Sequence, residues 1–120
     1  MNRSVLTMNP EQTLEEAAQY MIERQVGSAV VVSNGAVVGI VTERDVMRAV
    51  ARGLVPWNTK LEEVMTREPI TASPDGTTAE AAQVMLEHGF RHLPVVEGTQ
   101  LVGIVSLRDV LIDPEPADTS

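Results

Sequence analysis

Apolar and polar positions follow two different spacings along this 120-residue chain. Short runs of Val, Ala and Ile at residues 29–32 and 37–41 predict buried strands. Before them, apolar residues follow the i, i+3, i+4, i+7, i+8 spacing of a core-facing helix over residues 14–25. The members of that stripe are Leu14, Ala17, Ala18, Met21 and Ile22.

The whole pattern occurs twice. The segment GIVTERDV begins at Gly39, and the similar GIVSLRDV begins at Gly103, 64 residues later. The same offset predicts a second helix over 78–89 and a second pair of strands over 93–96 and 101–105. A register kept this well indicates an internal duplication. The second helical stripe consists of Ala81, Ala82, Met85 and Leu86.

Each copy therefore has the predicted order β-α-β-β-α. A short extended piece at residues 5–7 or 70–71 precedes the first helix, and a last helix at 43–52 or 107–112 follows the hairpin. One copy alone has too little core to be stable, so we expect two copies to pack together. The predicted fold is α/β (α+β), made of tandem β-α-β-β-α repeats with pseudo-twofold symmetry.

The repeats set the expected boundaries along the chain. Residues 1–53 form repeat 1, residues 54–63 the linker, and residues 64–112 repeat 2. In the linker, Trp57 is the expected packing anchor and Thr59 the expected start of a capped turn. Residues 113–120 are polar and contain two prolines, which predicts a disordered tail.

The repeated segment ends in a hydroxyl residue followed three positions later by a carboxylate. Thr42 with Asp45, and Ser106 with Asp109, fit a helix capping box in which each group satisfies a free backbone N–H. The same arrangement fits an anion site, because a helix N-terminus attracts phosphate and a nearby carboxylate can bind ribose hydroxyls. The octapeptide by itself leaves both interpretations open.

Composition and charge narrow the classes of protein. The net charge of −8 argues against a general nucleic-acid surface. The chain has no Cys and only two His, so thiolate chemistry is excluded and a metal centre is not expected. No apolar stretch is long enough for a membrane span and no leader is evident, so we expect a cytoplasmic protein.

Catalysis finds little support in the sequence. No Ser, His and Asp set has a suggestive spacing, and no glycine-rich phosphate loop is present. The two repeated carboxylates are explained more simply by duplication than as an acid–base pair. We therefore expect no catalytic residues and no enzyme activity.

Both repeats resemble the CBS domain, so the chain is similar to a CBS-domain pair. The resemblance covers residues 1–112 and rests on two ordered sets of short motifs. Repeat 2 carries it most clearly, in Val64-Met65-Thr66, His92-Leu93-Pro94-Val95-Val96 and the segment from Gly103 to Asp109.

The resemblance implies a regulatory sensor. Its expected ligand is an adenosine-containing molecule (AMP, ADP, ATP or S-adenosylmethionine) held in clefts between the repeats, and its expected assembly is a homodimer that regulates an attached or bound partner. By position, Asp45 and Asp109 would bind ribose, and Thr42 and Ser106 would contact phosphate or ribose. The other ligand-binding positions implied are Thr7, Ser28, Ala29, Arg44, Thr71, Arg91, His92, Pro94 and Arg108.

The repeats differ at these positions. Gly27-Ser28 in repeat 1 replaces Arg91-His92, so the first site should be poorer in positive charge, and Val30 replaces Pro94. Two alternatives stay open: a ligand-free dimerisation or scaffold module in which the boxes are only caps, and a regulatory fragment of a larger enzyme or transporter.

Overall fold

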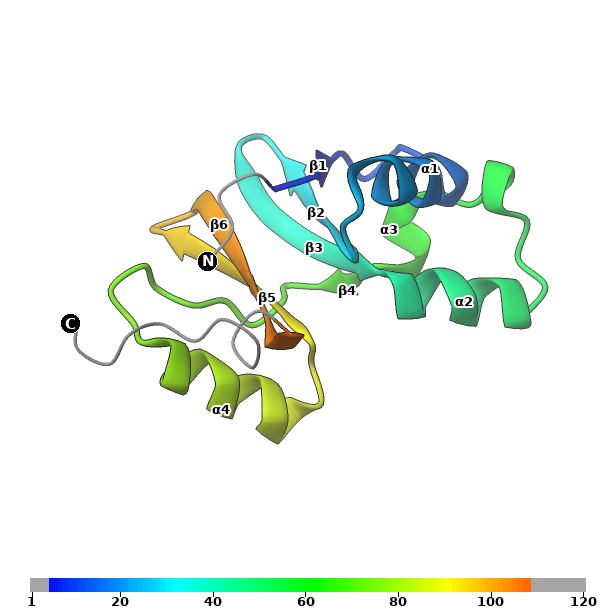
Figure 1. The fold of residues 1–120 in the computed structure, drawn as a ribbon. Coiled ribbons are helices and arrows are strands. Elements are labelled where there is room, and N and C mark those ends of the chain that lie inside the picture. Colours follow the sequence, from blue (N-terminus) through cyan, green and yellow to red (C-terminus); the bar gives the residue numbers. More distant parts are fainter. Residues whose placement is uncertain (1–4, 109–120) are drawn as a thin grey trace. The chain divides into compact units, whose positions relative to one another are not determined.

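The computed structural model describes residues 5–108, which form two compact units. One unit is Val5–Pro69, and the other begins at Ile70 (Figure 1). Each contains one helix followed by a two-stranded hairpin, as the duplication predicts. No helix in residues 5–108 has the length and apolar character needed to cross a bilayer.

The first unit is built on a four-stranded sheet of order β1-β2-β3-β4. Strand β1 (Thr7–Met8) runs parallel to β2 (Ser28–Ser33), which forms an antiparallel hairpin with β3 (Ala36–Thr42). Asn34 and Gly35 both have positive φ, the pattern of the tight turn predicted there. Strand β4 (Thr66–Arg67) then pairs antiparallel with β3, a strand that the apolar pattern does not predict.

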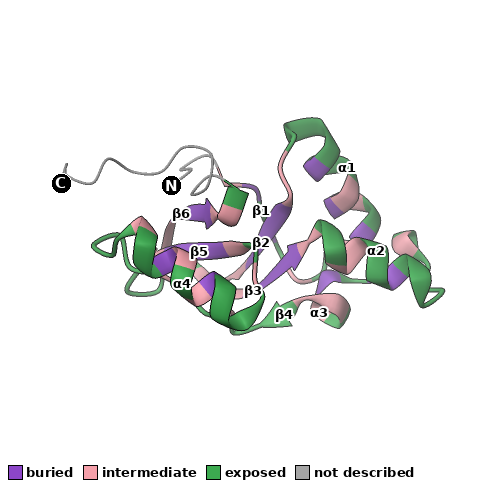
Figure 2. Ribbon diagram, turned by 60° about the horizontal axis from the view of Figure 1, so that its bottom comes forward, coloured by how far each residue is buried: buried purple, intermediate pink, exposed green. Residues whose placement is uncertain are grey.

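Two helices pack against this sheet. Helix α1 (Leu14–Arg24) contacts β2, α2 (Glu43–Ala51) contacts β3, and the two helices contact each other. Leu14, Ala17 and Met21 are buried, which confirms most of the predicted stripe (Figure 2). The prediction is wrong for Ile22, the last residue of the stripe, which is 80% exposed.

The segment expected as a linker contains ordered structure. A 3-10 turn, η1 (Pro56–Asn58), precedes α3 (Leu61–Val64), and Leu61 is fully buried in the core of the first unit. Thr59 does not cap α3: its hydroxyl donates to the Val55 carbonyl, 2.7 Å away, and Lys60 is the N-cap residue. Trp57 is 67% exposed, so it is not an internal packing anchor of this chain.

Within the described residues, the second unit repeats the helix and hairpin of the first. Helix α4 (Thr78–His88) precedes an antiparallel hairpin of β5 (His92–Glu97) and β6 (Gln100–Ser106). The predicted extended piece at 70–71 is reduced to one bridge between Ala72 and Val95. In the first unit the Val30 N–H donates to Leu6, 2.9 Å away, but Pro94 stands at the equivalent position and has no N–H to donate.

The second helical stripe is also confirmed only in part. Ala81 and Met85 are buried, whereas Leu86 is 69% exposed. The predicted last helix begins at Leu107, and its continuation to 112 and the predicted tail lie outside the described residues.

Candidate functional site

The segment from Thr42 to Asp45 forms a complete capping box at the start of α2. The Asp45 Oδ2 atom accepts from the Thr42 N–H at 2.9 Å and from the Thr42 hydroxyl at 3.2 Å, and the Asp45 N–H reaches Thr42 Oγ1 at 3.3 Å. The capping interpretation is thus correct. It uses only one of the two carboxylate oxygens, and no hydrogen bond within residues 5–108 engages Oδ1.

The backbone amides at this helix start are mostly occupied. The Glu43 N–H donates to the Gly27 carbonyl at 3.1 Å, and the Asp45 N–H donates to Thr42. Among the described residues, only the Arg44 amide of these three has no partner. The anion site expected from a bare helix N-terminus is therefore reduced to one amide, and bound phosphate would depend on side chains.

The sheet brings Ser28 next to this box. Ser28 is the cross-strand partner of Thr42, and it is buried although it is polar. Thr7 is exposed on β1, where it pairs with Val30. Ala29 is fully buried and belongs to the hydrophobic core, so only its backbone is suited to ligand contact.

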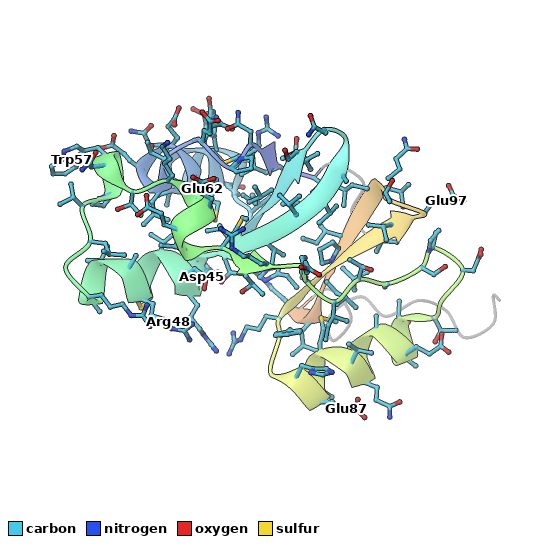
Figure 3. All side chains as sticks on the ribbon, turned by 180° about the vertical axis from the view of Figure 1, so that it is seen from behind. Asp45, Arg48, Trp57, Glu62, Glu87 and Glu97 are labelled. Carbon is cyan, nitrogen blue, oxygen red and sulfur yellow. The ribbon has the colours of Figure 1, made fainter. Side chains whose placement is uncertain are left out.

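Two arginines extend from α2 beside the box. Arg44 is exposed, and its side chain makes no hydrogen bond or ion pair with the described part of the chain. Arg48 lies one turn further along, with Nη1 3.8 Å from Asp45 Oδ1 (Figure 3). Its side chain is 57% exposed, whereas that of Asp45 is 14% exposed. Arg48 is not among the residues implied by the resemblance, although its spacing of three from Asp45 could have indicated it.

The second repeat has the same local plan. His92 pairs with Ser106 across the hairpin as Ser28 pairs with Thr42, and the Leu107 N–H donates to the Arg91 carbonyl at 2.8 Å as Glu43 does to Gly27. Arg91 and Arg108 are exposed. Asp109, the predicted ribose ligand of this repeat, lies outside the described residues.

Other predicted positions of the second repeat lie along the strand that precedes this point. Pro94 is buried, and its carbonyl accepts from the Ala72 N–H at 2.8 Å. Thr71, next to Ala72, is exposed. Within residues 5–108, no three His, Cys, Asp or Glu side chains gather as a metal site would require.

Comparison with known proteins establishes the family. The CBS domain family matches this chain twice, over residues 1–52 and 61–113. A CBS domain-containing protein of Bacillus subtilis, YhcV, is 38% identical over 114 residues, which cover 94% of this chain and 81% of that protein. The chain therefore belongs to the CBS-domain family and contains a pair of these domains, which are regulatory modules.

Solved structures give the same fold. A CBS domain protein of Pyrobaculum aerophilum, PAE2072, complexed with AMP, is 30% identical with a TM-score of 0.87, covering 98% of this chain and 89% of that one. The CBS domain pair of MJ0100, complexed with 5′-methylthioadenosine and S-adenosyl-L-methionine, is 29% identical with a TM-score of 0.83, covering 92% and 88%. Some other relatives are much longer, and the chain spans as little as 20% of their length.

Proposed function

We propose that this chain is a non-catalytic sensor that binds an adenosine-containing ligand at the hydroxyl-x-x-Asp segment of its repeats. AMP, ADP, ATP and S-adenosylmethionine are the candidate ligands. The observation that carries the proposal is the Asp45 carboxylate, which keeps Oδ1 outside the capping box and beside a guanidinium. An ionised carboxylate accepts several hydrogen bonds, so one oxygen can hold the helix start while the other binds ribose hydroxyls.

The chain offers a matched control for this role. Helix α1 begins with an equivalent box, in which the Thr13 N–H donates to Glu16 Oε1 at 2.8 Å and the Glu16 N–H reaches Thr13 Oγ1 at 3.2 Å. The resemblance to the CBS domain implies no ligand contact at this Thr13–Glu16 box. Glu16→Ala and Asp45→Ala remove the same kind of cap, so they should cost a similar stability, about 1 kcal/mol.

Ligand binding separates the two variants. Each is melted with and without millimolar AMP, ADP, ATP or S-adenosylmethionine, and binding is measured by calorimetry. The shift of the melting midpoint on ligand addition should persist in Glu16→Ala and be reduced in Asp45→Ala. Equal ligand responses in both variants would mean that Asp45 only caps helix α2 and does not bind the ligand. No response of the unsubstituted chain to any of the four ligands would favour the scaffold alternative.

The proposed sensor works as a cytoplasmic homodimer that reports ligand occupancy to a protein partner. Support for self-association comes from the exposed apolar side chains Ile22 and Leu86, which occupy the same helical position in the two repeats. Exposed apolar side chains mark an interaction surface when they are part of a contiguous patch, so this proposal requires Ile22 and Leu86 to belong to such patches. The regulated partner is an attached domain or a separate protein, as in the regulatory-fragment alternative.

A further inference from the structure

We infer that Arg48 makes the first-repeat site selective for phosphate-bearing nucleotides over nucleosides, an inference that rests on the proposed function. The site needs a local positive group, because the whole chain carries a net charge of −8. The helix start provides little of it, since the Glu43 and Asp45 amides already have protein acceptors. Selection for an anion at this site must therefore come from side chains.

The two repeats place their arginines differently. Arg44 has a counterpart in Arg108, so this arginine is common to both repeats. The residue equivalent to Arg91 in the first repeat is Gly27. The residue equivalent to Arg48 in the second repeat is Ile112. At these two positions, each repeat carries an arginine that the other lacks, and the two arginines come from different elements. Arg48 restores to the first repeat the positive charge that is missing at Gly27.

The geometry suits a contact with phosphate. Arg48 Nη1 is 3.8 Å from Asp45 Oδ1, beyond normal hydrogen-bond length, so the ion pair is loose and leaves the guanidinium donors available. The side chain is 57% exposed and can turn toward a ligand. A nucleotide whose ribose hydroxyls bind Oδ1 carries its 5′-phosphate across the sugar ring from those hydroxyls. The long Arg48 side chain would have to extend past the ribose to reach it, and its guanidinium can bind a phosphate with two parallel N–H groups.

The test compares AMP with adenosine by calorimetry. Asp109→Ala is introduced in every sample, so that the first-repeat site dominates the signal. Arg48→Gln is compared with Arg52→Gln, which removes the same charge from the exposed end of the same helix. We expect Arg48→Gln to lower the preference for AMP over adenosine roughly tenfold, the size of one charge-assisted contact, and Arg48→Lys to recover part of it.

Three results would overturn the role of Arg48 while leaving the proposed function intact. In the first, Arg48→Gln leaves the affinities for both AMP and adenosine unchanged. In the second, it weakens both ligands equally, which would mean that Arg48 only orients Asp45. In the third, Arg52→Gln lowers the ratio as much, which would be an effect of overall charge. If the chain without these substitutions binds neither AMP nor adenosine, nor S-adenosylmethionine or ATP, the proposed function itself fails.

Discussion

Gly39 lies on β3 where β4 pairs with it. A Cβ built at Gly39 would lie 2.8 Å from Met65 Cγ and 3.0 Å from the Thr66 carbonyl oxygen, and it would also collide with the Met65 sulfur. Gly39→Ala should therefore destabilise the chain by about 1–3 kcal/mol, the usual cost of overpacking. Urea denaturation followed by circular dichroism measures this change in the free energy of unfolding.

The partner in this contact can be tested separately. Met65 is flexible and contributes most of the obstruction, so Met65→Ala should cost less in the Gly39→Ala background than in the original chain. The difference between the two costs is the coupling energy of the pair. Additive effects would show that Met65 does not obstruct a side chain at position 39, and that the fixed Thr66 carbonyl is responsible.

At the same residue scale, the sequence predicts the capping chemistry of the site well. The spacing of Thr42 and Asp45 is sufficient, because a capping box is local and depends on residues three positions apart. The pairing of Ser28 with Thr42 is not local and follows only from the hairpin register. The loose contact of Arg48 with Asp45 depends on side-chain conformation, which an apolar pattern does not encode.

The short helix α3 lies in the segment expected as the linker, where the sequence predicts only a capped turn. Residues 54–63 contain a proline and no sustained apolar stripe, so the pattern predicts a connection between repeats. A single residue ties this segment to the first unit, because Leu61 of α3 is fully buried in the hydrophobic core of that unit. A single anchoring side chain is too small a signal for a periodicity argument, whereas helices α1 and α4 extend over three turns and are predicted to within one residue.

Burial of Leu61 leads to a stability prediction for this element. Leu61→Ala should cost 2–5 kcal/mol, the range for a fully buried leucine, because the cavity left behind cannot close completely. Leu54→Ala is the matched control: Leu54 lies in the same segment but is 38% exposed, so its loss should cost less than half as much. Denaturant midpoints of the two variants measure these losses, and a Leu61→Ala loss as small as the one expected for Leu54→Ala would mean that Leu61 is not a core anchor.

The two repeats differ in how their first strand is joined to the sheet, because Val30 in one is replaced by Pro94 in the other. In the first copy the Val30 N–H donates to the first strand, whereas Pro94 has no N–H to donate. Within the described residues, the first-strand segment of the second copy is joined to β5 through Ala72 alone. The sequence shows the proline plainly. Its consequence becomes predictable only when the register places residue 94 opposite the first strand of its own repeat, which is a property of the tertiary structure.

For the whole molecule, self-association is the property that duplication makes easiest to test. Ile22 and Leu86 fit the apolar stripes of their helices in sequence, yet both are exposed, so a fold prediction based on stripes alone places them wrongly in the core. If these side chains bind a second copy, Ile22→Glu with Leu86→Glu should shift the protein from dimer to monomer, because a buried interface does not tolerate unpaired carboxylates. Sedimentation velocity at several protein concentrations measures the shift.

Two controls separate the apolar contact from general effects of charge and exposure. Ile22→Gln with Leu86→Gln adds no charge and should also weaken the dimer, since the apolar area is lost. Trp57→Gln removes another largely exposed apolar group, outside the two helices, and should leave the assembly intact. A monomeric unsubstituted chain, or a dimer unaffected by the Glu pair, would contradict this interface. A dimer lost only in the Glu pair would indicate charge repulsion near an interface whose apolar contacts lie elsewhere.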